Sequence, residues 1–571
     1  MKKIVCLALA LTLALSLFAG ASLAEDRRVL TIASMVDYSS YFDTDIFREI
    51  EDELNIEIQY TTYDENSFAA MLSGGDLADI MMPKKMTINI LESGLALNLD
   101  PYIEEYAPNM NSDACKDSMD LSRKMLSTDG GLYIIPPVLG LHNALPGGVS
   151  QPTRGYAVRW DWYKELGCPE INNDDDYLNV LLQIKEKHPT TENGDPTILF
   201  GVHKSFGDFA GYRAAFRSDL AMNTWANYQY KSNIFTNDIT DGYMDVENSR
   251  YWAEMEFYNK IYRMGEWDED NFTHSGDEFN AKIEKGVYCG LYMSYSQLYN
   301  AARKEDPMTD KAYVIVPSKN MTNYANISLA TGNMNSYYSF VNKDTKNIDI
   351  VMKLYNYMYD LDFCRYIYSG KQGVDWDYDE NGVPSLTEEA LKARSMGEPY
   401  WSTGKGNGGH GMRHHGFMGY NPAVLGTDGY PLDLTLTHEA ATAAQSPLMA
   451  DVAKTYGYEY WGDLFDAYEK DFRNDMGSDI SACITTMTTD DLRLINACDA
   501  ILESRMAELI YAETDEEYTE IQQSVLEELA DAGEPAMFEK YQAEWNRVRD
   551  IIKPVHHAMA ERNGIELYPE E

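Results

Sequence analysis

The stretch FAAMLSGGDLADIMMPKKMTINILESGLALNLDPYIEEYAPNM, residues 68–110, decides how the chain folds. It opens with apolar side chains at helical spacing, and Gly74 and Gly75 follow, where glycine ends a helix with the least backbone strain. Residues 80–82 form a short apolar run typical of a buried strand, and a second helix-like segment leads to a second apolar run at 95–99. This order of helix, strand, helix and strand predicts part of an α/β sheet.

The residues before this stretch extend the same pattern. Residues 29–33 are rich in β-formers, and a polar, aromatic loop, a helical segment and a further strand at 56–60 follow them. Ligands of open α/β sheets bind at the carboxyl ends of the strands, where this loop must lie. Tyr38 and Tyr41 are therefore candidate binding residues. Simple packing is the alternative for each of them, because the chain has 42 tyrosines.

The order of residues in these segments resembles that of a known protein family. The order small-Gly-Asp-x-x-Asp-Ile at 74–80, then Gly-x-x-x-x-Leu-x-Pro-Tyr-Ile and Tyr-Ala-Pro-Asn, is similar to the first lobe of extracellular solute-binding proteins of ABC importers. That family includes the maltose- and alginate-oligosaccharide-binding proteins. Residues 159–167 resemble its signature Arg-x-Asp-Trp-Leu-x-x-Leu-Gly, which marks the crossing into the second lobe. The resemblance makes Asp79, Arg159 and Trp160 candidate ligand-binding residues, with packing as the alternative for the tryptophan.

The resemblance implies a fold and a division into domains. The expected fold is α/β, a two-lobed periplasmic-binding-protein-like fold of type II with mixed sheets flanked by helices, a hinge between the lobes and extra C-terminal helices. Residues 25–140 with 318–365 are expected to form lobe 1, and residues 141–317 with 366–571 to form lobe 2. Closure of the lobes around ligand is the expected motion.

Further aromatic residues are candidates for sugar contacts. Tyr295 follows the predicted strand 286–294, at a point where sugar-binding members of the family stack an aromatic residue on a sugar ring. The stretch 400–420 holds seven glycines and three histidines, and it contributes Trp401 and Arg413 as candidates for ligand contact. A zinc site and a plain surface loop are the alternatives for this stretch.

One motif points to calcium. Asp377, Asp379, Asn381 and Glu388 fit the spacing D-x-D-x-N-G-x₅-E, whose clustered oxygens suit that ion. The alternative is a plain β-hairpin with an Asp-Gly turn, which family members often have here. We transfer no calcium site of the alginate-binding relatives to residues 188–196, which lack most of the carboxylates. No other cofactor is expected.

Composition limits the function classes. The chain has 571 residues, enough for two to four structural units, and 44% hydrophobic residues, enough to fold. Its formal net charge of −45 repels phosphate backbones and anionic lipid, so nucleic acid and nonspecific membrane binding are not expected. The acidic surface is interpreted as a solvated surface that keeps an exported protein soluble, and affinity for cations is the alternative.

Residues 1–24 are predicted to be a cleaved signal peptide, with a positive start, an apolar core and small residues at the cleavage site. The family often carries a lipidated cysteine here, whereas this chain has Ala21. The protein is therefore expected outside the cell or in the cell envelope, without a direct lipid anchor. Six cysteines remain after cleavage, and they could form disulfides or stay as buried free thiols.

These observations together predict a noncatalytic, monomeric receptor that binds a carbohydrate, in particular an oligosaccharide, as its small-molecule ligand. It would deliver that ligand to the permease subunits of an ABC transporter. The main alternative is an exported glycosidase that uses paired carboxylates. A surface scaffold that has lost its ligand is a third interpretation.

Overall fold

The chain folds around two separate sheets, each built from short apolar runs. In the computed structural model the described residues are 27–37, 39–42, 44–83, 88–136, 139–142, 156–202, 236–238, 243–244, 250–291, 311–318, 323–328, 338–395, 419–468, 472–474, 480, 483–484 and 488–562.

The first sheet has five strands in the order β2-β1-β3-β13-β4. β1 runs parallel to β2 and β3, so that Ser34 lies opposite both Thr62 and Met82. β13 pairs antiparallel with both β3 and β4, so β4 runs in the same direction as β1. The second predicted apolar run is not a strand, because it contributes only a bridge between Ala96 and Asn342. The strand bounds are β1 Arg28–Ser34, β2 Ile56–Thr62, β3 Ile80–Met82, β4 Ile134–Ile135 and β13 Ser339–Val341.

Helix α4 of the first lobe ends at the glycines identified from the sequence, and it begins three residues before the predicted start. α4 starts after Asp64, whose carboxylate accepts a hydrogen bond from the Ser67 amide at 2.7 Å, and it ends at Gly75 with φ +72°. α3 buries Ile46, Phe47 and Ile50 in the core of the first lobe. The helices are α2 Ser39–Phe42, α3 Asp45–Leu54, α4 Glu65–Gly74, α5 Ile88–Glu92, α6 Asp100–Tyr106, η1 Pro108–Asn111, α7 Asp113–Met125, α14 Ile348–Met358 and α15 Leu361–Ser369.

The second sheet has four strands in the order β11-β6-β10-β7. β7 and β10 are parallel, and β6 lies antiparallel between β10 and β11. A glycine is required at position 201, because a Cβ there would lie 2.5 Å from the ring of Tyr288. The bounds are β6 Ala157–Arg159, β7 Ile198–Gly201, β10 Tyr288–Leu291 and β11 Tyr313–Ile315.

Most of the remaining helices pack around this second sheet, and its core also takes in the helical C-terminal region. Capping boxes start α12 at Ser275 and α22 at Thr488. In each, the side chain of the first residue accepts from the amide three positions later, and the carboxylate at that later position accepts from the amide of the first residue. The helices are α8 Trp160–Glu165, α9 Asp174–Lys187, α11 Arg250–Arg263, η3 Glu269–Phe272, α12 Gly276–Lys285, α18 His438–Ala444, α19 Pro447–Thr455, α20 Trp461–Tyr468, α22 Thr489–Tyr511, α23 Asp515–Ala532 and α24 Glu534–Arg562.

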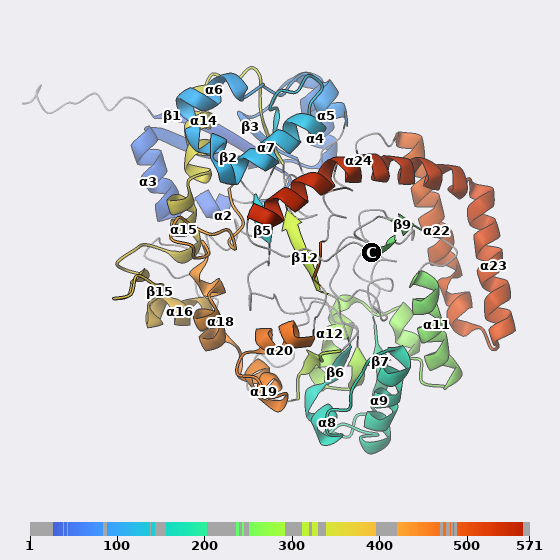
Figure 1. Cartoon of the computed structure of the whole chain (residues 1–571). Helices are drawn as coiled ribbons and strands as arrows, with labels where there is room; N and C mark the ends of the chain where they lie inside the picture. The colour runs from blue at the N-terminus through green and yellow to red at the C-terminus, as the bar shows by residue number, and fades with distance from the viewer. Residues whose placement is uncertain are drawn as a thin grey trace, which may run out of the picture.

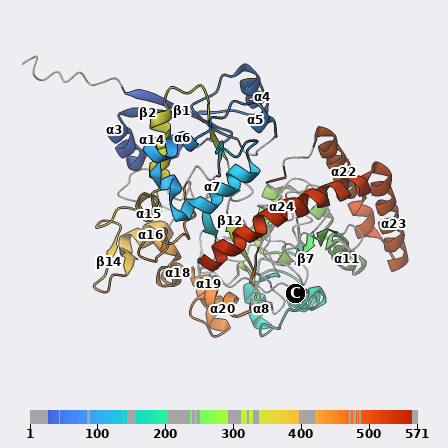
Figure 2. The same cartoon turned by 45° about the horizontal axis from the view of Figure 1, so that its top comes forward.

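Two strands connect the lobes, which Figures 1 and 2 show as separate bodies. β5 Gly140–His142 lies between β4 and β6 in the chain, and β12 Asn323–Ser328 lies between β11 and β13. β12 pairs antiparallel with β5 and parallel with β16 Phe472–Asn474. β11 belongs to the second sheet, so β12 makes the return crossing to lobe 1. The predicted α/β class with two lobes and extra C-terminal helices is confirmed.

The predicted lobe boundary at residue 365 is wrong for the segment that follows. The core of the first lobe also buries side chains from this segment, namely Ile367, Tyr368, Tyr420 and Leu432. The Tyr368 hydroxyl donates a hydrogen bond to the Tyr420 carbonyl at 2.7 Å, which joins two parts of the segment. The other short elements are β8 Thr236–Asp238, β9 Tyr243–Met244, β14 Trp376–Tyr378, β15 Pro384–Leu386, α16 Glu388–Ser395 and η5 Leu434–Leu436.

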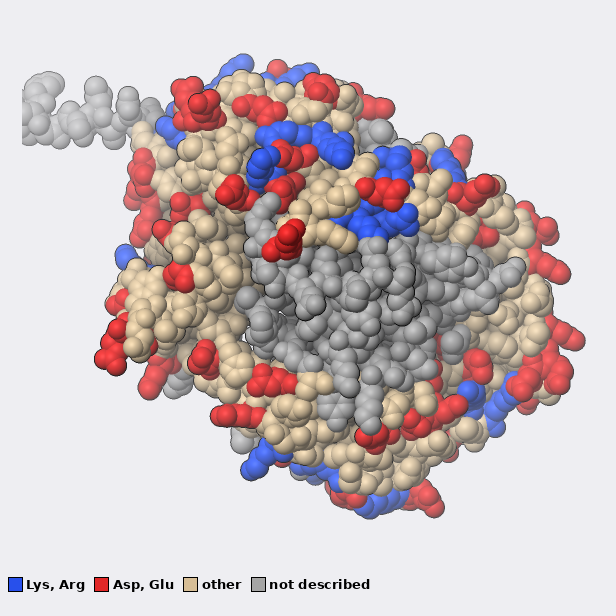
Figure 3. Space-filling model, in the orientation of Figure 1, with Lys and Arg blue, Asp and Glu red and all other residues tan. Residues whose placement is uncertain are grey.

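The drawn surface is rich in carboxylates, and the described cysteines form no disulfide. Carboxylates lie over both lobes on the face drawn in Figure 3, while Lys and Arg gather mainly where α7 and α24 lie. The six cysteines of the mature chain are all free, and only Cys168 is not fully buried. The described helices include none that is both long and apolar enough to cross a bilayer.

Candidate functional site

The strand order of the first sheet defines a candidate binding edge. The chain places β2 on one side of β1 and then β3 on the other side, so the direction in which strands are added reverses at β1. The carboxyl ends of β1 and β3 are Ser34 and Met82. Ligands of open α/β sheets bind outside the carboxyl ends of the strands at such a reversal. β1 leads directly into residues 35–37, and α2 follows at residues 39–42, so these described residues lie at the candidate edge.

Hydrogen bonds fix the backbone at this edge. The Ser34 carbonyl accepts from the Tyr63 amide at 3.0 Å, and the Tyr60 hydroxyl donates to the Val36 carbonyl. Asp37 is exposed, and hydrogen bonds from Ser39 lower the pKa of its carboxyl. An ionised carboxylate on a fixed loop is a good acceptor for hydroxyl groups.

Sequence reasoning missed Tyr63 at this edge. Tyr63 follows β2, and its ring stacks on Phe68 with centroids 5.0 Å apart and planes 16° from parallel. Tyr63 could have been identified from the sequence, because it directly follows the strand β2, which is parallel to β1 and ends at the same edge of the sheet.

The second sheet has a comparable edge. Leu291 at the end of β10 lies opposite Gly201 at the end of β7. Tyr295, four residues beyond β10, lies outside the described residues. So do Tyr38, Trp401 and Arg413, whereas Tyr41 lies in α2 at the candidate edge. Their predicted ligand contacts stay predictions.

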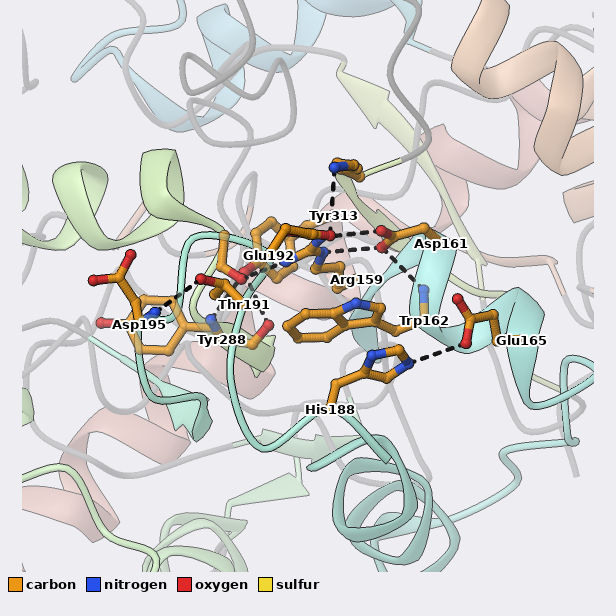
Figure 4. Close-up of polar contacts among 12 residues, drawn as sticks. Arg159, Asp161, Trp162, Glu165, His188, Thr191, Glu192, Asp195, Tyr288 and Tyr313 are labelled. Atoms are coloured by element: carbon orange, nitrogen blue, oxygen red, sulfur yellow. Dashed lines mark hydrogen bonds and ion pairs between the residues drawn. The ribbon is translucent and has the colours of Figure 1, made fainter. Parts of the chain in front are cut away.

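Arg159 is buried inside the second lobe, where four hydrogen bonds use its guanidinium (Figure 4). Its Nε and Nη2 donate to the two oxygens of Asp161 at 2.9 and 3.0 Å, and Nη2 also reaches Glu192 at 2.6 Å. Nη1 donates to the Gly286 carbonyl at 2.7 Å. The guanidinium therefore ties β6, the start of α8, the loop after α9 and the end of α12 together.

Trp162 is enclosed between the Arg159 guanidinium and the His188 imidazole. The Arg159 guanidinium lies 3.7 Å from the centre of its indole, and the His188 ring stacks on it at 4.8 Å, 11° from parallel. His188 in turn contacts Glu165 at 3.2 Å. Both faces of the indole are covered, so this cluster offers no platform for a sugar ring, and Arg159 has a structural role in place of the predicted ligand contact.

The ionisation of the cluster follows from its pairing. Burial opposes the charge of Arg159, but the hydrogen bond and the attraction of Asp161 outweigh it, so the pKa of Arg159 is raised. Burial also opposes the charge of Glu192, yet its own backbone amide, Arg159 and Lys311 hold the pKa of Glu192 below its ordinary value. Charged partners on both sides favour a fixed ion cluster.

Trp160 also has a structural role in place of the predicted ligand contact. Its side chain is fully buried, and its Nε1 donates to Asp451 at 2.7 Å. Lys164 donates to the same carboxylate oxygen at 2.7 Å. The two residues thereby attach α19 to α8, a contact between residues nearly 300 positions apart.

Asp79 holds the first sheet together. Its Oδ2 accepts from the Thr31 amide at 2.9 Å and from Asn347 at 3.1 Å, and its Oδ1 accepts from Thr345. The backbone carbonyl of Asp79 accepts from the Asn342 amide at 3.0 Å. The carboxylate therefore joins β1, β3 and the start of α14, so the ligand contact predicted for Asp79 gives way to a structural role.

The calcium motif lies on a β-hairpin. β14 and β15 pair antiparallel, and Asp379 accepts from the amides of Asn381 and Val383 at 2.8 Å, which closes the turn. Asp377 accepts from Gln372, and Glu388 begins α16. Within the described ranges no three Asp, Glu, His or Cys side chains gather closely enough to hold a metal ion. The calcium site remains a prediction.

Comparison with known proteins supports the fold. No sequence profile of a known protein family matches the chain, and no curated sequence matches it either. Solved structures match with the two-lobed fold of ABC-transporter substrate-binding proteins. The S. pneumoniae protein FusA, an EF-hand mutant in complex with fructo-nystose, has 15% identity and a TM-score of 0.57, covering 92% of this chain and 100% of that one.

Two further structures match over the same extent. An HMO-binding, ABC-transporter-associated solute-binding protein from Bifidobacterium longum infantis has 15% identity and a TM-score of 0.56, covering 92% of this chain and 99% of that one. The alginate-binding protein AlgQ2, without calcium ion, has 16% identity and a TM-score of 0.51, covering 93% and 99%. At these identities the likeness defines the fold, and this chain has it.

Proposed function

We propose that the protein is a noncatalytic extracellular receptor that captures a carbohydrate, in particular an oligosaccharide, between its lobes and delivers it to an ABC transporter. The observation that carries the proposal is the pairing of two α/β lobes through crossing strands β5 and β12, in the fold of FusA and AlgQ2. Those two proteins bind a fructo-oligosaccharide and alginate, which supports a sugar ligand here.

The chemistry of the candidate edge supports the same ligand class. An exposed, ionised Asp37 supplies an acceptor for sugar hydroxyls, and Tyr41 on α2 belongs to the same edge. Tyr295 is expected to supply the aromatic face for a pyranose. The binding set that we propose is Tyr38, Tyr41, Tyr295, Trp401 and Arg413, without the three residues that have structural roles.

The ionisation of the carboxylates favours binding over hydrolysis. A glycosidase needs a carboxylic acid whose pKa is raised, so that it can donate a proton. Among the described residues, Glu534 is the carboxyl with a raised pKa, about 7, and burial raises it. It lies at the start of α24, in the C-terminal helices and outside both sheet edges.

A thermal-shift screen of residues 25–571 against mono- and oligosaccharides, peptides and calcium tests the proposal. A ligand at 100 times its dissociation constant stabilises by about 2.7 kcal/mol, which is visible as a shift of a few degrees. Tyr41→Ala and Tyr295→Ala should lose the saccharide shift. Tyr511→Ala is the matched control, because Tyr511 is an exposed tyrosine at the end of α22. Peptide-only stabilisation would contradict the sugar assignment.

We also propose that the chain is exported by its first 24 residues, works as a monomer and has no direct lipid anchor. The sequence motif Asp377, Asp379, Asn381 and Glu388 is the remaining candidate for calcium. The calcium arm of the screen tests it, with Asp379→Asn as the variant that should lose the shift. No shift with calcium would leave the hairpin as a structural element.

A further inference from the structure

Helix α24 connects the two lobes at a place outside the crossing strands. It has 29 residues and therefore spans about 44 Å. Figures 1 and 2 both show it running from α22 and α23 in the second lobe across to α7 of the first lobe. Direct contacts of α24 with α22, α23 and α7 agree with both views.

The first half of α24 is fixed to the second lobe. Met537, Tyr541 and Trp545 are buried in the core of that lobe. Lys540 forms an ion pair with Asp491 at the start of α22. This half of the helix therefore moves with α22.

α7 is fixed to the first lobe on one side and meets α24 on the other. Ser122 of α7 donates a hydrogen bond to the Ile134 carbonyl of β4 at 2.6 Å, and Cys115 and Met119 are buried in the first core. Leu121, by contrast, is 2% exposed and is buried in the core of the second lobe.

The side chains of α24 that share this cluster are apolar. Val548 and Ile552 of α24 are fully buried in it, and Ile551 and Val555 pack against it. Pro554 lies within the helix among these residues. Proline removes one main-chain hydrogen bond of a helix, so α24 bends most readily where it meets α7.

We propose that the contact of α24 with α7 is a second linkage between the lobes, and that it sets how far they move apart and how tightly the protein holds its ligand. The crossing strands alone would permit a wide range of angles between the lobes. A buried apolar contact across them is lost or must slide when the angle changes, so it favours one arrangement. A ligand held by both lobes then binds more or less tightly as that equilibrium shifts.

The affinity part of this inference rests on the proposed receptor function, whereas the lobe movement does not. The test therefore measures both. Spin labels at Glu104→Cys on α6 and Glu186→Cys on α9, both exposed, report the distance between the lobes. Native thiols interfere little, because burial raises the pKa of Cys115, Cys289 and Cys364 to about 11 or 12, and Cys168→Ser removes the partly exposed one.

Leu121→Ala should broaden the distribution of distances between the labels. It should also change the dissociation constant of the saccharide found in the screen at least about fivefold, the lower end of coupling between distant sites. Leu354→Ala is the control, because it removes a fully buried leucine from the core of the first lobe alone. The control should leave the distance distribution unchanged.

Ile552→Ala removes a buried side chain of α24 from the cluster that also holds Leu121. If the two residues stabilise the same linkage, the double variant should broaden the distance distribution little more than either single variant. If Leu121→Ala does not fold, Leu121→Val gives a smaller effect of the same kind. An unchanged distance distribution in the Leu121 variants would overturn the proposal, and so would an equal broadening in Leu354→Ala. If no saccharide binds, the distances still decide the linkage, while the receptor function fails separately.

Discussion

Replacing Glu534 by glutamine should stabilise the protein at high pH. Glu534 is 6% exposed, and its Oε1 has no hydrogen-bond partner among the described residues. Burial raises the pKa of its carboxyl from 4.5 to about 7. Between pH 4.5 and about pH 7 the folded protein keeps the Glu534 proton, whereas the unfolded chain loses it. The free energy of unfolding therefore falls as pH rises through this range.

The size of the effect follows from the two pKa values. At 1.36 kcal/mol per pKa unit, ionisation of Glu534 costs about 3 kcal/mol of unfolding free energy at pH 8 and less than about 1 kcal/mol at pH 5. Glutamine keeps the shape of the side chain and removes the charge. Glu534→Gln should therefore gain about that much at each pH.

Urea unfolding followed by circular dichroism at pH 5 and pH 8 measures this difference. Glu539→Gln is the control, because Glu539 lies on the same helix and is exposed. The control should change stability by less than about 0.5 kcal/mol at either pH. An equal gain for Glu534→Gln at both pH values would refute the reasoning, since the effect would then not come from ionisation.

Three further substitutions test the architecture. Arg159→Lys cannot make the paired hydrogen bonds to Asp161, so urea unfolding should show a loss of about 2 kcal/mol, and unchanged stability would contradict the cluster. Gly201→Ala places a Cβ 2.5 Å from Tyr288 and should cost about 1–3 kcal/mol in the same assay, while an unaffected protein would mean that the ring moves freely. Burial opposes the charge of Asp428, but Arg365 and neighbouring donors hold its pKa at about 2, below its ordinary 3.8. Ionised Asp428 therefore stabilises the folded protein by about 2 kcal/mol above pH 3.8, and this stabilisation is lost as the pH falls toward 2. Asp428→Asn should therefore lower the unfolding free energy by about 2 kcal/mol at pH 5 and by much less near pH 2. An equal loss at both pH values would exclude this ion pair as a source of acid dependence.

Local signals allowed much of the fold to be predicted. The bounds of β3 agree with the prediction, because an apolar run with turn residues on both sides is a local feature. At the start of α23 the Thr514 hydroxyl accepts from the Glu517 amide, but the Glu517 carboxylate accepts from the Glu513 amide, so a full capping box does not form. Such a choice depends on backbone geometry that residue types do not specify.

The binding residues were harder to predict because their neighbours are distant in the chain. Arg159 was expected near the ligand from its place in the Arg-x-Asp signature. Its burial depends on Glu192 and on Gly286, 127 positions further along. Trp160 likewise depends on Asp451. The signature therefore lies at the first strand and helix of the second lobe, β6 and α8, while tertiary contacts decide which side chains remain open to ligand.

Native mass spectrometry of residues 25–571 with the best saccharide of the screen tests the central claim most directly. The account predicts one bound saccharide per protein monomer, with the sugar at its intact mass after prolonged incubation. Cleaved sugar would show an enzyme, and the absence of any bound saccharide at saturating concentration would contradict the carbohydrate receptor.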